Sequence, residues 1–328
     1  MIHAAAMNQT ERTERTTPRL ALGCMGMSGA YGPTDEAQSV AVIHSAIERG
    51  ITLLDTGDFY GSGHNELLVG RAIAGRRDRV QLSVKFGMLR GPDGIPAGID
   101  ARPAALKNFL AYSLVRLGTD HVDVYRPARL DPAVPIEDTI GAIADLVKAG
   151  YVRAIGLSEV GPETIRRAAR VHPIADLQIE YSIVSRDAEE AIFAALSELG
   201  IGATLYGVLS RGLLSASALR AGDGRAHLPR FAGANGEANA RLVASLGGLA
   251  QRWGITPSQL AIGWVMAKQP QFVPTLGMRT MQQLDEALAT KPLSAEQCAE
   301  VEAIAPRGAV AGTRYPAAHM AALDSEKR

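Results

Sequence analysis

The chain has few of the features that mark secreted, membrane or nucleic-acid-binding proteins. It contains only two cysteines, Cys24 and Cys298, in 328 residues, which is too few for a disulfide framework and indicates free thiols in a reducing compartment. It has no run of about 18 uninterrupted apolar residues, so a membrane-spanning helix is not expected. The 34 basic and 34 acidic side chains cancel, so no overall charge attracts nucleic acid or an anionic membrane. We therefore expect a soluble, cytoplasmic protein whose partner is a small molecule.

The short motifs of several enzyme classes are also missing. No Gly-x-Gly-x-x-Gly follows a predicted strand, because Gly23, Gly26 and Gly29 have a different spacing and lead into a polar loop. The seven histidines form neither a His-x-His nor a His-Glu-x-x-His pair, so a metal hydrolase is not indicated. A Gly-x-Ser-x-Gly elbow is absent as well, which argues against an esterase.

What the chain does have is a regular alternation of two kinds of segment. Hydrophobic residues make up 47% and charged residues 21%, a balance that can bury a sizeable core. Short apolar runs alternate with longer amphipathic stretches, which is typical of repeated βα units. The runs predicted to be buried parallel strands are Arg19–Leu22, Ile51–Asp55, Val80–Lys85, Val122–Tyr125, Val152–Leu157, Ala175–Ile179, Ala203–Tyr206 and Phe272–Thr275.

Helical patterns fill the intervals between these strands. The predicted helices include Glu36–Arg49, Asn65–Ala74, Pro103–Leu117, Ile136–Ala149, Pro162–Val171 and Ala188–Leu199. Gly50, Gly118, Gly150 and Gly200 each stand where a helix must end and the chain must turn back. With no linker long enough to divide two domains, the pattern predicts a single-domain α/β fold, a (β/α)8 TIM barrel over residues 18–328, rather than two open sheets.

Three stretches fall outside this rhythm. Residues 1–17 contain no apolar run, so we expect a flexible tail and neither a signal peptide nor a membrane span. The glycine-rich stretch Ser210–Ala238 predicts a long irregular connection after the seventh strand, of the kind that is usually functional. After a predicted helix at Ala295–Ile304, residues 306–328 are expected to run back over the barrel or to fray.

Acidic, phenolic and basic side chains follow two neighbouring predicted strands. Asp55 and Tyr60 lie at and beyond the end of the second strand, and Lys85 lies at the end of the third, where barrels carry their active sites. Lys85 beside Tyr60 would lower the pKa of the phenol, and Asp55 would keep the lysine charged, which suits proton transfer. The same residues fit equally well a buried Asp55–Lys85 ion pair with Tyr60 as a wall residue.

Several motifs, in order, resemble the aldo-keto reductase superfamily, particularly its bacterial and plant branch. They are Leu22–Ser28, Asp55–Gly61, Gly63–Glu66, Ile155–Glu159, Gln178–Ser182, Leu209–Gly212 and Arg314–Pro316. The resemblance implies a (β/α)8 barrel that binds NADP(H) in an extended pose across the carboxyl ends of its strands. It also implies that Asp55, Tyr60 and Lys85 are catalytic, with Tyr60 as the general acid that protonates a carbonyl oxygen.

The resemblance further assigns residues to the cofactor. The matching positions are Ser158 and Gln178 at the nicotinamide carboxamide, Tyr206 stacked on the nicotinamide, Leu209, Ser210, Arg211 and Gly212 around the pyrophosphate, and Gly277, Arg279, Gln283 and Glu286 at the adenosine end. Arg279 stands where relatives place a basic residue against the 2′-phosphate, so NADP is favoured over NAD. Glu159 replaces the asparagine of many relatives outside this branch, and Ala287 stands where asparagine is frequent.

Ala128 marks the clearest departure from the resembled family. Relatives typically have a histidine there that helps to hold the substrate carbonyl, so alanine removes a hydrogen-bond donor and leaves extra volume. Strand alternation places Arg126 on the same face, inside the barrel mouth, and both residues are therefore assigned to the substrate pocket. An arginine there needs a partner, for which Glu180 is a candidate. Arg126 either supplies the missing electrophile or forms a structural ion pair, and we favour the structural role.

The implied function is carbonyl reduction with NADPH, or the reverse oxidation of an alcohol. The substrate is set by loops at the barrel rim and is not legible in the sequence. Two other functions are compatible with the sequence. One is a cofactor-binding regulatory barrel with little turnover, against which the intact Asp55, Tyr60 and Lys85 argue. The other is a reductase of a conjugated double bond, since relatives with a substituted histidine can change their reaction.

Overall fold

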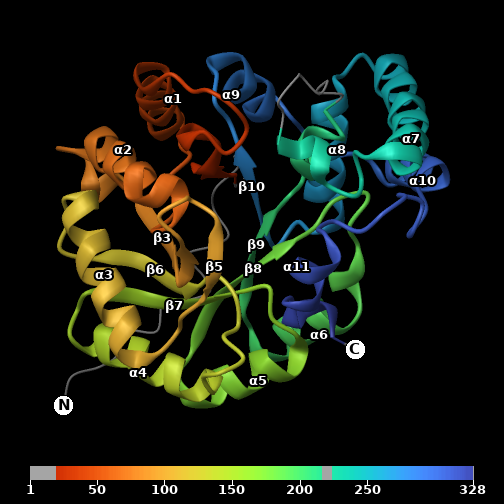
Figure 1. Cartoon of the computed structure of the whole chain (residues 1–328). Coiled ribbons are helices and arrows are strands. Elements are labelled where there is room, and N and C mark those ends of the chain that lie inside the picture. The colour runs from red at the N-terminus through yellow and green to blue at the C-terminus, as the bar shows by residue number, and fades with distance from the viewer. Residues whose placement is uncertain (1–19, 216–223, 328) are drawn as a thin grey trace.

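Eight parallel strands form a closed barrel in the computed structural model, which describes residues 20–215 and 224–327 (Figure 1). Around the barrel the strands are β1 (Ala21–Gly23), β10 (Val273–Gly277), β9 (Gly202–Tyr206), β8 (Ile174–Glu180), β7 (Val152–Ser158), β6 (Val122–Pro127), β3 (Gln81–Phe86) and β2 (Leu53–Gly57). Closure leaves this sheet without a free edge. It also brings the carboxyl ends of all the strands to one rim. The predicted TIM barrel and its strands are confirmed.

Helices surround the barrel and cover its outer face (Figure 1). They are α1 (Glu36–Glu48), α2 (His64–Ile73), α3 (Pro103–Leu117), α4 (Ile136–Lys148), α5 (Pro162–Val171), α6 (Ala191–Leu199), α7 (Gly233–Arg252), α8 (Pro257–Lys268), α9 (Met281–Leu288), α10 (Ala295–Ile304) and α11 (Ala317–Ala321). Gly50, Gly118, Gly150 and Gly200 adopt φ between 63° and 91°, because only glycine reaches this region without strain. The predicted helix ends are therefore confirmed.

Helix α8 is buried on nearly all sides, which its sequence explains. Its residues from Leu260 to Met266 are apolar or glycine and are all buried. The helix begins with a capping box in which Thr256 and Gln259 each bond the other's backbone, so its first amides are satisfied. Helices α7, α9 and α10 pack against it, which is why it lacks the polar face of a surface helix.

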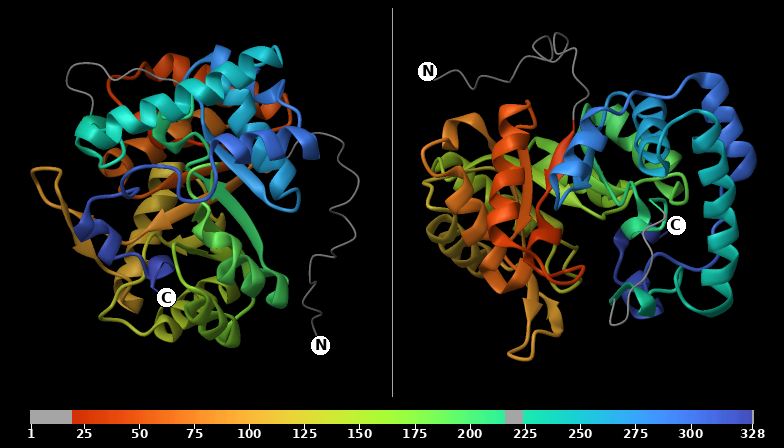
Figure 2. Two further views of the ribbon diagram at one scale, coloured as in Figure 1. Left: turned by 90° about the vertical axis from the view of Figure 1, so that its right-hand side faces the viewer. Right: turned by 90° about the horizontal axis from the view of Figure 1, so that it is seen from above.

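Two elements differ from the predicted alternation. A short antiparallel hairpin, β4 (Met88–Arg90) and β5 (Pro96–Ile99), follows β3 and projects from the body of the barrel (Figure 2). Its strands are mostly exposed, so they lack the apolar run by which the barrel strands were found. Helix α7 begins at Gly233, inside the stretch predicted to be irregular up to Ala238. The described residues before it contain only 3-10 turns.

The C-terminal segment runs back over the barrel, as predicted. Arg314 donates to the carboxylate of Glu159, just after β7, at 2.6 Å. Asp324 accepts hydrogen bonds from the amide of Gly161 at 2.9 Å and the hydroxyl of Thr164 at 2.7 Å, which caps the first turn of α5. These contacts hold the end of the chain against the rim.

Other features of the sequence have simple outcomes. Cys24 and Cys298 are buried free thiols, as predicted. None of the helices in the described part of the chain is long and apolar enough to cross a membrane. The predicted tail of residues 1–17 lies outside the described residues.

The Glu159–Arg314 pair leads to a prediction about stability. Both side chains are buried, so Arg314→Met leaves a buried carboxylate without its cation and should lower the free energy of unfolding by about 3 kcal/mol. Urea denaturation measures the loss. Arg166→Met, which removes an exposed ion pair with Glu198, is the matched control and should cost at most about 1 kcal/mol. Equal losses in the two variants would contradict the structural role of Arg314.

Candidate active site

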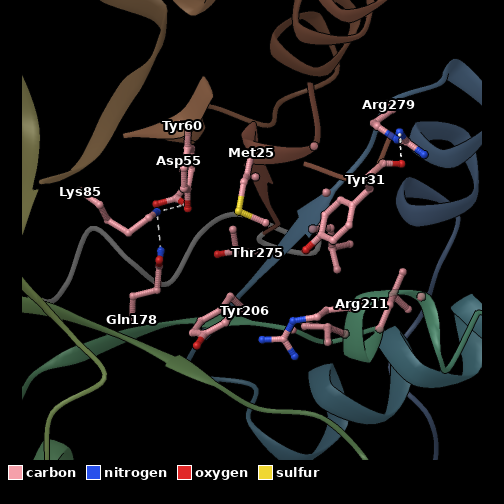
Figure 3. Close-up of a pocket in the computed structure, with 18 of the residues that line it drawn as sticks. Met25, Tyr31, Asp55, Tyr60, Lys85, Gln178, Tyr206, Arg211, Thr275 and Arg279 are labelled. Carbon is pink, nitrogen blue, oxygen red and sulfur yellow. Dashed lines mark hydrogen bonds and ion pairs between the residues drawn. The ribbon is translucent and has the colours of Figure 1, made fainter. Parts of the chain in front are cut away.

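A buried ion pair stands at the carboxyl ends of β2 and β3. Lys85 Nζ donates to Asp55 Oδ2 at 2.5 Å (Figure 3), and both side chains are almost fully buried. The other carboxylate oxygen, Oδ1, accepts from Ser83 Oγ at 3.0 Å and Gln178 Nε2 at 2.9 Å. These hydrogen bonds and the lysine charge offset the cost of burying the carboxylate.

Tyr60 lies beside this pair, on the short 3-10 helix Tyr60–Gly63 that follows β2. Its ring centroid is 5.1 Å from Lys85 Nζ. Burial raises the pKa of Tyr60 well above its ordinary value, and the charge of Asp55 raises it further. The predicted lowering of this pKa is therefore not the net result, because burial and the charge of Asp55 dominate. The phenol stays protonated at neutral pH, which is the state that a general acid needs.

These residues open onto a cavity of about 400 Å³ at the barrel rim, a size typical of small-molecule sites. The predicted site residues on its wall are Asp55, Tyr60, Lys85, Ser158, Gln178, Tyr206, Leu209, Arg211, Gly212, Gly277, Arg279 and Gln283. Figure 3 shows Arg279 and the Asp55–Lys85 pair on different sides of this cavity. The predicted residues therefore meet in one place, although they come from six strands and the segments that follow them.

Two predicted cofactor residues are not on the cavity wall. Ser210 is buried and accepts a hydrogen bond from Arg230 at 3.1 Å. Glu286 accepts from the hydroxyl of Thr256 at the start of α8. Both side chains are thus occupied within the protein.

Comparison with known protein families identifies the family of this chain. The model of the aldo/keto reductase family matches residues 19–306. The chain belongs to the aldo/keto reductase family.

Its relatives include plant and bacterial proteins. It is 40% identical over 309 residues to a probable aldo-keto reductase 1 of Glycine max, with 90% of this chain and 88% of the relative covered. The glycerol dehydrogenase structure from Gluconobacter oxydans has a TM-score of 0.79 and 27% identity, covering 89% of this chain and 92% of the other. The aldo/keto reductase from Klebsiella pneumoniae, in complex with NADP and acetate, has a TM-score of 0.71 and 25% identity, with 92% and 95% covered.

Arg126 and Ala128 were predicted to line the substrate pocket, but neither lines the cavity of this aldo/keto reductase. Arg126 is fully buried in the barrel interior and pairs with Asp176 at 2.5 Å, so the predicted partner Glu180 is wrong. Both acids are on β8, but Glu180 is four residues further on, or roughly 13 Å along a strand. The pairing supports the structural role that we favoured. Ala128 is 1% exposed and leaves no opening in the wall.

Glu180 and Glu159 instead form a network of charges below the rim. Glu180 lies within 3.6 Å of cationic nitrogens from Arg211, Arg230 and Arg314. Burial would raise the pKa of Glu159, but the charge and hydrogen bonds of Arg314 outweigh it and lower the pKa to about 2. Its carboxylate also accepts from the hydroxyl of Tyr206 at 2.7 Å. Glu159 therefore acts as an anchor for the rim.

Arg211 and Arg279 bring positive charge to the wall near β9 and β10. Arg211 stacks over the ring of Tyr315, 4.3 Å from its centroid, on a turn where Ser210 and Arg211 adopt φ of 45° and 56°. Such strain in non-glycine residues is found at functional sites. Arg279 Nη1 donates to the carbonyl of Tyr31 at 3.3 Å, and no carboxylate of the described chain forms an ion pair with it. Cations in these positions suit an anionic ligand.

The sequence analysis missed several residues of the cavity wall. They are Met25, Tyr31, Phe59, Met88, Arg129, Arg225, Thr275 and Tyr315, among others. Tyr315 was in a recognised motif, and its hydroxyl lies 3.2 Å from that of Tyr206, a contact between distant segments that no local pattern reveals.

In the parts of the chain that the structure describes, no three His, Cys, Asp or Glu side chains are grouped so that they could hold a metal ion.

Asp58 lies between the end of β2 and Tyr60, and its carboxyl group has an unusual environment. One of its oxygens, Oδ1, is buried and has no hydrogen-bond partner among the described residues. Burial, together with the negative charge of Glu66, raises its pKa to about 7. The folded protein therefore binds a proton at Asp58 more tightly than the unfolded chain does.

This shift predicts how stability depends on pH. Because the pKa of Asp58 is higher in the folded state, its contribution is complete below its ordinary pKa of 3.8 and is lost as the pH rises towards about 7. Asp58→Asn does not titrate, so its melting temperature should rise relative to wild type across this window and then level off. The exposed Asp78→Asn is the control and should run parallel to wild type. A constant difference between Asp58→Asn and wild type would show that the shift is absent.

Proposed function

We propose that this enzyme reduces an aldehyde or ketone to an alcohol with NADPH, or catalyses the reverse reaction, with Tyr60 as the general acid. The observation that carries the proposal is the position of the Tyr60 phenol beside the Asp55–Lys85 pair, on the wall of a cavity that also presents cations. Membership of the aldo/keto reductase family supports carbonyl reduction in general.

The cavity fits a dinucleotide phosphate. Arg279 offers a guanidinium without a carboxylate partner in the described chain, and Arg211 stands on the turn after β9. A guanidinium matches phosphate oxygens in geometry and charge, so Arg279 would hold the 2′-phosphate and Arg211 the pyrophosphate. Ser158 and Gln178 would hold the nicotinamide carboxamide beside the ring of Tyr206. The Klebsiella pneumoniae relative in complex with NADP supports this cofactor.

The protein's own groups then perform the proton transfer. NADPH, when bound, supplies the hydride that reaches the carbonyl carbon. Tyr60 donates its hydroxyl proton to the carbonyl oxygen, which yields the alcohol. Lys85 stabilises the phenolate that remains, and Asp55 holds Lys85 in place through the ion pair. In the oxidation direction the phenolate takes the proton back.

Removing the phenolic hydroxyl tests this mechanism. Tyr60→Phe should lower kcat by at least about 100-fold while the Kd for NADPH changes little, because the hydroxyl acts in proton transfer and not in holding the cofactor. Lys85→Met should behave similarly. The measurements are NADPH oxidation across a panel of aldehydes, ketones and enones, and fluorescence titration of NADPH. The exposed Tyr112→Phe is the matched control. Wild-type turnover in Tyr60→Phe would rule the mechanism out.

The cofactor preference gives a second test. NADP(H) should bind at least about tenfold more tightly than NAD(H), which corresponds to about 1.4 kcal/mol. Arg279→Ala should remove most of this difference by weakening NADP(H) alone. Arg170→Ala, an exposed arginine on α5, is the control and should leave both affinities unchanged. Equal affinities for the two cofactors in the wild-type protein would contradict the assignment of Arg279.

A further inference from the structure

Arg129 is a cation on the cavity wall that the mechanism above does not use. It follows β6 and is half-buried. Its Nη1 donates to the carbonyl of Ala128 at 2.6 Å, and its Nη2 lies 3.5 Å from the hydroxyl of Tyr315. Among residues 20–215 and 224–327, no carboxylate forms an ion pair with it.

Other arginines at this end of the barrel have carboxylate partners. Arg126 pairs with Asp176, and Arg314 with Glu159. Arg211 and Arg230 share Glu180. Removing a cation from water is costly unless an anion compensates it. Each of these four side chains has a carboxylate in direct contact, whereas Arg129 has none and Glu159 acts on it only through its charge.

The 2′-phosphate of the cofactor does not account for Arg129. Arg279, proposed to meet the 2′-phosphate, follows β10, whereas Arg129 follows β6. Three strands separate β6 from β10 in either direction around the barrel, so these two arginines stand on opposite sides of the rim. Arg129 is therefore open to an anion other than the 2′-phosphate.

The surroundings of Arg129 place it at the reacting end of the cavity. Arg129 and Tyr60 line the same cavity, and Arg129 contacts the hydroxyl of Tyr315, which lies 3.2 Å from the hydroxyl of Tyr206. A ligand that touches Tyr60 is therefore within the field of Arg129. A guanidinium here can donate a hydrogen bond to each oxygen of a carboxylate.

We propose that Arg129 anchors the substrate and that the substrate carries a carboxylate in addition to the carbonyl that is reduced. This inference rests on the proposed carbonyl reduction. Binding at two points, the carboxylate on Arg129 and the carbonyl oxygen on Tyr60, orients the reacting carbon without a histidine at position 128. The enzyme is thus a reductase of oxo acids.

Rigid aldehydes provide the test, because they fix the distance between the two groups. The probes are ortho-, meta- and para-carboxybenzaldehyde, each with its methyl ester as the uncharged match, at saturating NADPH. For at least one isomer the wild-type kcat/KM should be at least about tenfold higher for the acid than for the ester, mainly through KM. Arg129→Met should bring this ratio close to one, and Arg129→Lys should restore part of it. Arg166→Met, at an exposed pair on α5, should keep the wild-type ratio.

A binding measurement separates this inference from the proposed function. Isothermal titration of benzoate into the NADP⁺-loaded protein should show at least about tenfold weaker binding in Arg129→Met than in wild type. If no carbonyl compound is reduced, the proposed function fails, and the titration still decides the role of Arg129. A wild-type acid-to-ester ratio near one for all three isomers, or a ratio that survives in Arg129→Met, would overturn the inference. An equal loss for acid and ester would also overturn it, because Arg129 would then act on the carbonyl.

Discussion

Asp55 and Lys85 bring opposite charges into the barrel end, where either charge alone would be strongly destabilising. Gln178, which donates to the same carboxylate, belongs to β8. Three strands separate β8 from β2 in either direction, so the contact crosses the barrel. Asp55 therefore holds Lys85 on the neighbouring strand and Gln178 on the opposite side of the barrel. Tyr60 follows β2 by only a few residues and takes its position from this arrangement.

A second layer of charges holds the segments that complete the cavity. Glu180 attracts Arg211 from the turn after β9 and Arg314 from the C-terminal segment. Arg314 also binds Glu159. Because Tyr315 follows Arg314 and lies under Arg211, the outer wall depends on acids buried beneath it. The rim is thus shaped by paired charges as much as by apolar packing.

Ala128, where the resemblance places a histidine in relatives, is covered, so its small side chain does not open a space in the wall. The next residue, Arg129, reaches the cavity and remains without a carboxylate from the described chain. In the proposed binding mode, Arg129 orients the substrate by holding its carboxylate, whereas a histidine would orient it by donating to the carbonyl. In this proposed mode, electrostatic attraction at that point would also select substrates by charge.

The sequence by itself determined the barrel, because the alternation of apolar runs and amphipathic stretches reports directly on burial in βα units. It also determined that Asp55, Tyr60 and Lys85 meet, since the carboxyl ends of neighbouring parallel strands share one rim. Only the tertiary structure decided that Arg126 pairs with Asp176 and not with Glu180, because strand alternation gives the face of a residue and not its depth in the barrel. Likewise, the raised pKa of Tyr60 and the exposure of Arg129 to the cavity depend on desolvation and on contacts with distant segments, which no local pattern contains.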